Sequence, residues 1–162
     1  MLKMVFKNEV ASEYKLEEKD FESLFKKSIK EIDQFKDVKG IIQLNIVKEK
    51  EITKLNKKYR KKNKSTDVLS FSFLGQEKFP GDDLVGEIFI CAKIAEKQAQ
   101  EHKVKLKDEA QFLFVHGMLH LSGLDHENPE EFKKMYKEHG KIMPMDKWKN
   151  IVKQIYKESF ED

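Results

Sequence analysis

The stretch that decides how this chain organises its chemistry is HGMLHLSGLDH, residues 116–126. His116 and His120 are four residues apart, so on a helix their side chains lie on the same face. Gly123 follows at the expected helix end, where glycine can adopt a positive φ and turn the chain sharply. That turn would bring His126 back to the same point. The spacing therefore predicts three imidazoles that converge at the end of a core helix.

Three neutral imidazole nitrogens form a ligand set that suits Zn²⁺. Three protein ligands leave a fourth position open to water, which is typical of catalytic rather than structural zinc. We therefore predict one zinc ion per chain, bound by these three histidines. Asp125 would either replace His126 as a ligand or, as we favour, accept a hydrogen bond that orients a ligating ring. His102 and His139 have no such spacing and are expected at the surface.

The histidine stretch overlaps the metzincin protease motif H-E-x-x-H-x-x-G-x-x-H at every histidine and at the glycine. The glutamate of that motif, the general base in the proteases, is missing, because Gly117 occupies its position. This difference argues against a zinc peptidase. Met143 and Met145 resemble the metzincin Met-turn only weakly, and we expect them to fill the core.

The positive charge of the chain is concentrated in one short segment. The formal net charge is +3, yet residues 54–64 (KLNKKYRKKNK) hold seven basic side chains and no acidic one. Arg60, the only arginine among 32 basic residues, lies inside this segment. A guanidinium offers a planar fork that binds phosphate in bidentate fashion, which lysine cannot do. We predict that Arg60 contacts phosphate and that neighbouring lysines bind an anionic substrate, chiefly Lys58, Lys61 and Lys62.

The remaining sequence predicts an α+β fold with one small mixed sheet of about four strands, flanked by about five helices. The expected strands are 4–8, 41–47, 66–73 and 85–90, the last of them at a sheet edge. The histidine pair lies on a core helix expected over residues 107–122. Pro129 suits the first turn of a later helix, which Gly140 would end.

Several protein classes are excluded by composition. Cys91 is the only cysteine, so neither an intrachain disulfide nor a cysteine-rich zinc site is expected. The first ten residues lack an apolar run of signal-peptide length, and no stretch approaches the roughly 20 apolar residues that span a bilayer. We expect a cytoplasmic protein with no membrane contact. Because no linker divides the chain, residues 1–162 are interpreted as a single domain.

Three stretches together resemble the YbeY family of bacterial metal-dependent endoribonucleases. They are Leu55-Asn56 and Tyr59-Arg60 leading into TDVLSF (66–71), then GEI (86–88), and then the histidine stretch 116–126. The order of the expected elements also fits the family. One position differs, since Glu87 stands where the family commonly has aspartate.

The resemblance implies a zinc ion on the three histidines and a catalytic or phosphate-binding role for Arg60. It also implies cleavage of single-stranded RNA. The expected role is maturation of ribosomal RNA, notably at the 3′ end of the small-subunit RNA, and ribosome quality control. Ribosomal RNA and ribosomal subunits would then be the partners.

The mechanism that we expect is metal-assisted phosphodiester hydrolysis, with a zinc-activated water or hydroxide as nucleophile and Arg60 stabilising the phosphate. An attack by the RNA 2′-hydroxyl is equally compatible with the sequence. Asp67, Glu87 and Asp125 are candidate bases. The alternative function is a non-catalytic, zinc-containing ribosome-assembly factor that binds rRNA through the basic segment.

Overall fold

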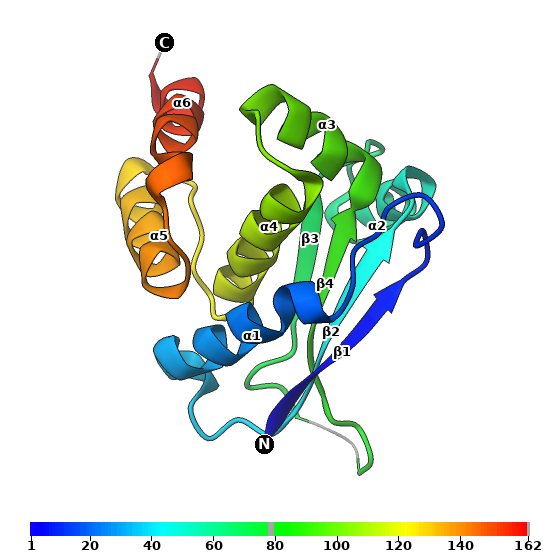
Figure 1. Cartoon of the computed structure of the whole chain (residues 1–162). Coiled ribbons are helices and arrows are strands. Elements are labelled where there is room, and N and C mark those ends of the chain that lie inside the picture. Colours follow the sequence, from blue (N-terminus) through cyan, green and yellow to red (C-terminus); the bar gives the residue numbers. More distant parts are fainter. Residues whose placement is uncertain (78–79, 162) are drawn as a thin grey trace.

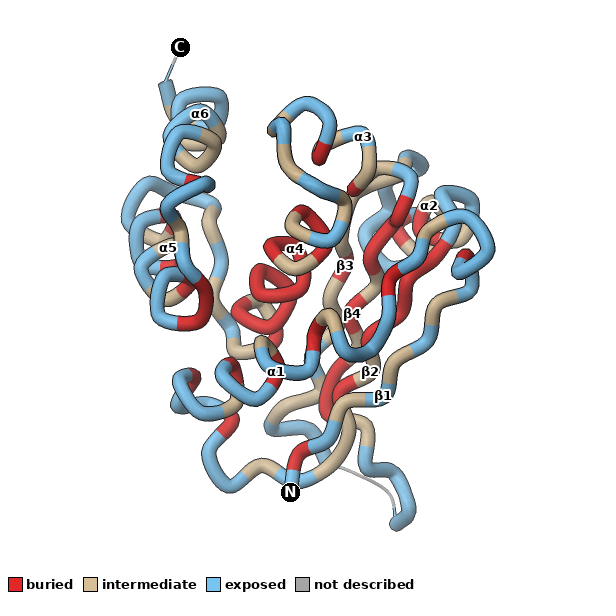
Figure 2. The backbone as a smooth tube through the Cα atoms, in the orientation of Figure 1, coloured by how far each residue is buried: buried red, intermediate tan, exposed pale blue. Residues whose placement is uncertain are grey.

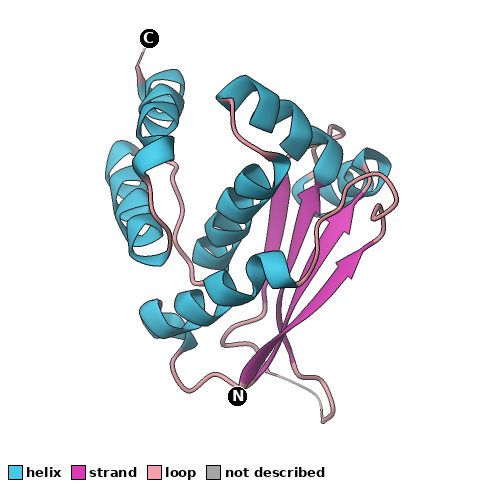
Figure 3. Ribbon diagram, viewed as in Figure 1, coloured by secondary structure: helices cyan, strands magenta, loops and turns pink. Residues whose placement is uncertain are grey.

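The computed structural model describes residues 1–77 and 80–161 and has a four-stranded mixed sheet in the order β1-β2-β4-β3. The strands are β1 (Leu2–Asn8), β2 (Gly40–Val47), β3 (Val68–Ser72) and β4 (Leu84–Cys91). β1, β2 and β4 are parallel, and β3 runs antiparallel to β4 (Figures 1 and 3). The predicted mixed sheet of four strands is confirmed. Residues 78 and 79, in the sequence between β3 and β4, lie outside the described part of the chain.

The prediction that the strand at residues 85–90 lies at a sheet edge was wrong. β4 lies in the interior of the sheet, with β2 on one side and β3 on the other. Its residues Val85, Ile88, Ile90 and Cys91 are all buried, and such strands with both faces covered suit the middle of a sheet. The edge next to the site is β3 instead.

Within residues 1–77 and 80–161, six α-helices surround the sheet, against the five or so expected. They are α1 (Lys19–Glu31), α2 (Glu49–Arg60), α3 (Ala92–His102), α4 (Leu106–Leu121), α5 (Pro129–Ile142) and α6 (Lys149–Phe160). Short 3₁₀ turns occur at Asp33–Phe35 and Asp146–Trp148. In the described chain none of the helices combines the length and apolar character needed to cross a bilayer.

The expected end of the helix at Gly140 was also wrong. α5 runs through Gly140 to Ile142, and Met143 is the extended residue that follows. Gly140 does not adopt a positive φ, so it does not terminate the helix. Pro144 explains the true boundary better, because the residue before a proline is pushed out of the helical region.

Helix α4 lies at the centre of the hydrophobic core. With α1 it covers one face of the sheet, while α2 packs on the other face (Figure 1). α3 packs against α4, and its buried Ala92 and Ala95 join the same core. Eleven of the sixteen α4 residues are buried, and Figure 2 shows this helix as mostly buried along its length. A helix that is apolar all round belongs in a core, so its position is rigidly determined. Met143 and Met145 pack against the same core, as predicted.

Candidate metal centre and its cleft

Two glycines allow α4 to approach the sheet closely. A Cβ on Gly117 would lie 3.0 Å from the Ile88 side chain, and a Cβ on Gly86 would lie 2.9 Å from Leu121. Both contacts are closer than a side chain tolerates without displacement of its neighbour. A glutamate at position 117, the general base of metzincins, would therefore be forced into β4. The packing supplies a physical reason against a peptidase mechanism in this chain.

The turn after α4 has the conformation that the sequence predicted. Gly123 has φ +103°, and its backbone N–H donates to His120 O at 3.0 Å. The backbone N–H of Leu124 donates to Leu119 O at 3.2 Å, which satisfies another terminal carbonyl of the helix. An Asp125 carboxylate oxygen then accepts the His126 backbone N–H at 2.8 Å. These bonds direct the chain back across the end of the helix.

The turn brings His126 to the histidine pair on α4. One potential ligand nitrogen from each of His116, His120 and His126 lies within 4.8 Å of the other two. The ring centroids are 4.7 Å apart for His116 and His120, 5.1 Å for His116 and His126, and 5.3 Å for His120 and His126. This spacing permits all three to bind one metal ion. The convergence of the three imidazoles, predicted from their spacing, is present in the structure.

Hydrogen bonding determines which His120 nitrogen is free. His120 Nδ1 lies 2.9 Å from Leu124 O, and since a carbonyl only accepts, Nδ1 carries the proton. The Nε2 lone pair is therefore available to a metal, an arrangement common among ligating histidines. The acceptor that orients this ring is thus the Leu124 carbonyl rather than the Asp125 carboxylate that we favoured. His116 Nδ1 is buried without a hydrogen-bond partner among the described residues.

The surroundings of His116 and His120 favour the neutral form that binds metal. Burial lowers the pKa of His116 well below its usual value, and the neighbouring histidines lower it further. Burial also lowers the pKa of His120, assisted by His126 and opposed by Asp125. Neutral imidazoles need lose no proton when a metal binds. The donor set, the spacing and the protonation state therefore all fit a divalent ion such as Zn²⁺.

The two remaining histidines do not lie at the surface as expected. His139 is fully buried, its ring 4.6 Å from that of Phe112, and neither of its ring nitrogens has a partner among the described residues. Its ring centroid is 6.4 Å from that of His116. His102 is partly buried, and its Nδ1 lies 2.9 Å from a carboxylate oxygen of the buried Glu109. Both side chains therefore belong to the interior behind the metal centre.

Arg60 is the last residue of α2 and lies against the edge strand of the sheet. Its Nη2 donates to Ser70 O at 3.0 Å, and its guanidinium carbon lies 5.4 Å from the centre of the Phe71 ring. No ion pair joins Arg60 to a carboxylate in residues 1–77 and 80–161. The guanidinium is thus held in position while most of its N–H donors remain available to an anion.

Arg60 and the histidine centre meet in one cavity. This cavity of about 420 Å³ is lined by residues from the end of α2, the β3 edge and the turn after α4, including Arg60, Ser70, His120 and Asp125. The charge of Arg60 also contributes to lowering the pKa of His120, after the larger effects of burial and His126. Guanidinium and imidazole therefore face the same space, although 60 positions separate them in the sequence.

A family model described as Endoribonuclease YbeY matches residues 6–147 of this sequence, well over half of the chain. The chain belongs to the YbeY endoribonuclease family. Endoribonuclease YbeY of Buchnera aphidicola subsp. Schizaphis graminum is 40% identical over 121 residues, covering 74% of this chain and 75% of that protein. Endoribonuclease YbeY of Francisella tularensis subsp. novicida is 39% identical over 97 residues, covering 58% and 60%.

A solved structure from Thermotoga maritima is similar in fold. It covers 93% of this chain and 93% of its own, with a TM-score of 0.54 and 25% sequence identity. The expectation that the chain is an enzyme of the YbeY family, with a mixed α+β fold, is thus confirmed.

The lysines predicted to bind substrate differ in their positions relative to the YbeY cleft. Lys62 lines the cavity with Arg60, and so does Lys64. Lys58 and Lys61 are not among the described residues that line it, and the Lys58 ammonium lies 5.1 Å from the centre of the Tyr59 ring. Both side chains are exposed on the flank of the same basic segment.

Asn56 is a structural residue of the cleft to which sequence reasoning gave no role. It is buried in α2, its side-chain amide donates to Lys64 O at 2.9 Å, and its own carbonyl accepts the Lys62 backbone N–H at 3.2 Å. Together these bonds fold residues 61–64 back over the end of the helix. A buried asparagine on an otherwise apolar helix face was the available signal.

The three carboxylates considered as general bases differ sharply in location. Asp125 lines the cavity with Arg60, and Asp67 lines a second cavity of about 370 Å³ that also includes His116 and His126. Glu87 follows Gly86 and precedes Ile88, both of which face α4, so its side chain points to the opposite face of the sheet. Burial raises the pKa of Glu87. Only Asp67 and Asp125 therefore remain as candidates beside the histidines.

Proposed function

We propose that this protein is a metal-dependent endoribonuclease that cleaves single-stranded RNA. The observation that carries the proposal is the cavity that Arg60 and His120 share, with ligand nitrogens of His116 and His126 within 4.8 Å of that of His120. Phosphodiester cleavage needs an electrophilic centre and a cation for the charge that develops on phosphate. The family membership supports RNA as the substrate.

The metal ion that we propose is Zn²⁺, one per chain, held by His116, His120 and His126. A divalent ion there supplies Lewis-acid polarisation of a phosphoryl oxygen and activation of a nucleophile near neutral pH. Leu124 O would hold the proton on His120 Nδ1 and so keep Nε2 directed at the ion.

Arg60 would act on the substrate directly. Its hydrogen bond to Ser70 O and its contact with the Phe71 ring limit the orientations of the guanidinium, so less side-chain entropy is lost when phosphate binds. The free N–H donors would stabilise the charge on the non-bridging oxygens. Asp125, across the same cavity, would orient the attacking group or accept its proton.

The basic segment would attract RNA to this cavity. We propose that Lys62 contacts backbone phosphate inside the cleft, and that Lys58 and Lys61 contact it along the flank. Such contacts do not depend on base sequence.

In the cell, we propose a role in maturation of ribosomal RNA at the 3′ end of the small-subunit RNA and in ribosome quality control. Its partners would be ribosomal RNA and ribosomal subunits, and it would act in the cytoplasm as a single domain over residues 1–162. The names of its relatives support endoribonuclease activity in general.

The test is cleavage of a single-stranded RNA by purified protein of defined metal content. We expect wild type to cleave it, and His120→Ala and Arg60→Ala both to be strongly impaired. If both variants cleave as fast as wild type, a contaminating nuclease is responsible and the proposal fails. If the wild type binds rRNA without cleaving any RNA, the non-catalytic assembly factor is correct.

A further inference from the structure

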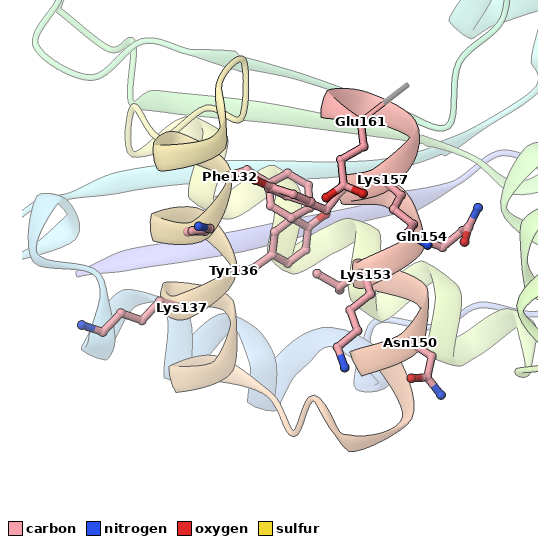
Figure 4. A pocket seen from close by; sticks show the side chains of 11 residues that line it. Phe132, Tyr136, Lys137, Asn150, Lys153, Gln154, Lys157 and Glu161 are labelled. Carbon is pink, nitrogen blue, oxygen red and sulfur yellow. The ribbon is translucent and has the colours of Figure 1, made fainter.

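A second surface with nucleic-acid-binding chemistry lies between α5 and α6. These two helices enclose a groove of about 600 Å³, well separated in sequence from the basic segment at residues 54–64. Figure 4 shows the rings of Phe132 and Tyr136 extending from α5 toward α6 across its floor. The groove lies beyond the cavity that Arg60 and His120 share, so the function proposed above does not use it.

The rim of the groove is strongly basic. Among the described residues, four lysines line it, Lys133 and Lys137 from α5 and Lys153 and Lys157 from α6, against one carboxylate, Glu161. All four lysines are exposed, and none forms an ion pair with any residue in the described part of the chain. Unpaired ammonium groups on two facing helices form an anion-attracting surface.

The floor of the groove is aromatic. The Phe132 ring centre lies 4.5 Å from that of Tyr136 and 5.3 Å from that of Tyr156, and Phe160 extends the cluster at 5.7 Å from Phe132. The Lys133 ammonium lies 5.8 Å from the centre of the Tyr156 ring. Aromatic rings bordered by lysines are the combination on which proteins bind single-stranded nucleic acid, with bases stacked on rings and phosphates on cations.

Helix α6 contributes little to the core. None of its twelve residues is buried, and its half-buried side chains include Tyr156 and Phe160 of the aromatic cluster. Both rings pack against Phe132 yet remain partly exposed beside the lysines, so part of each ring is open to a ligand.

The groove is next to the metal centre through one side chain. Tyr136 lines the groove and also the cavity that contains His116 and His126. Its ring centre lies 6.0 Å from that of His116. An RNA strand with its reactive phosphate at the histidines would therefore have neighbouring nucleotides within reach of the groove.

We propose that the groove between α5 and α6 is a second binding site for single-stranded RNA and holds nucleotides that flank the cleaved bond. The choice of RNA as ligand rests on the function proposed above, while the groove's charge and rings stand independently of it. Unpaired bases would stack on the partly exposed rings of Tyr156 and Tyr136, and Lys153 and Lys157 would neutralise phosphates.

The test is equilibrium binding of fluorescent 2′-O-methyl oligouridylates of 20 and 6 nucleotides to the metal-loaded protein, with their length verified afterwards. The groove variant is Lys153→Gln with Lys157→Gln. The matched control is Lys26→Gln with Lys30→Gln, which removes the same charge from exposed positions on α1. We expect the groove variant to bind the 20-mer about fivefold to tenfold more weakly, with a salt dependence shallower by about 1.4, whereas the control matches wild type.

Two single substitutions separate stacking from charge. Tyr156→Leu should weaken 20-mer binding about fivefold to tenfold without changing its salt dependence, because it removes a ring and no charge. Glu161→Gln should tighten binding about twofold, because it removes a carboxylate at the groove. The 6-mer can contact fewer of these side chains than the 20-mer, so each change should affect its affinity less.

The proposal would be overturned if the groove variant and the control variant both bound the 20-mer with the affinity of wild type. An RNA duplex that binds as tightly as the single strand while Tyr156→Leu has no effect would also overturn it. A wild-type dimer that the groove variant converts to a monomer, with RNA binding intact, would assign the groove to a second copy of the chain. Cleavage is measured in parallel, so absent RNA cleavage by wild type refutes the proposed function without altering the binding result.

Discussion

The two walls of the Arg60 cleft are built in opposite ways. On one side, the histidines come from α4 and the turn that ends it, and α4 is buried along most of its length. On the other side, Arg60 and the following basic residues lie at the exposed end of α2, against the open edge of β3. The first wall is positioned by core packing, and the second by a few hydrogen bonds and one aromatic contact.

This difference separates two tasks of the cleft, the positioning of the metal ligands and the attraction of RNA. A metal ion requires its ligands within a few tenths of an ångström, which a packed helix can guarantee. Capturing a charged polymer needs only a local excess of positive charge. Substitutions in the α4 wall should therefore abolish RNA cleavage, whereas substitutions in the α2 wall should only reduce it. Arg60 is the exception in the α2 wall.

The largest effect is expected for His120→Ala. Loss of one of three ligands should cost several kcal/mol of transition-state stabilisation, a fall in kcat of about 10³-fold or more. Single-turnover cleavage of RNA measures it, with circular dichroism as the control for folding. A residual rate above about one tenth of wild type would mean that the metal centre is not the reaction centre.

Arg60→Lys should show that the exposed wall also holds one chemically specific group. The substitution keeps the charge but removes the planar fork, and we expect kcat to fall about 10²-fold. Lys50→Gln, an exposed change near the start of α2, is the control and should leave the rate as in wild type. Equal rates for Arg60→Lys and wild type would reduce Arg60 to one more attracting charge.

The histidine convergence could be predicted from sequence because it depends on local geometry. The i, i+4 spacing and a glycine at the helix end are enough to bring the three rings together. The position of Arg60 could not be predicted in this way. It reaches His120 only because α2 packs on the face of the sheet opposite α4 and Arg60 extends along the β3 edge, a contact between distant segments.

The burial of His139, which we expected at the surface, could have been predicted from the sequence. Phe132, Met135, His139 and Ile142 follow one another at spacings of three and four, and all four are buried on one face of α5. A histidine in that register belongs in the core even without a polar partner. Gly140 misled for a different reason, because a glycine marks a helix end only where its φ is positive.

His139 also predicts how the buried side of the molecule responds to acid. Burial lowers its pKa to about 4, so in the folded protein it stays neutral where the unfolded chain is already protonated. Stability should therefore be unaffected above the unfolded pKa of about 6.5 and fall by about 3 kcal/mol between pH 6.5 and 4. Urea titrations of chelated wild type and His139→Gln measure this loss as the difference between their pH profiles, because His116 and His120 contribute to both. Parallel pH profiles for the two proteins would contradict it.

The smallest effect is expected for Lys62→Gln with Lys64→Gln at the Arg60 cleft. Each exposed lysine contributes little at physiological salt, so RNA affinity should fall about threefold with little change in kcat. The difference in RNA affinity between the variant and wild type should be larger at low salt, and kcat/KM at two ionic strengths measures it. A salt-independent loss would place these lysines with Arg60 in the catalytic geometry.

The most direct test of the account is the metal content of purified wild type and His126→Ala, measured beside their RNA cleavage. We predict one zinc ion per wild-type chain, less than a tenth of that in the variant, and cleavage that follows the metal content. A variant that retains one zinc per chain, or a chelated wild type that cleaves RNA at its full rate, would contradict the account.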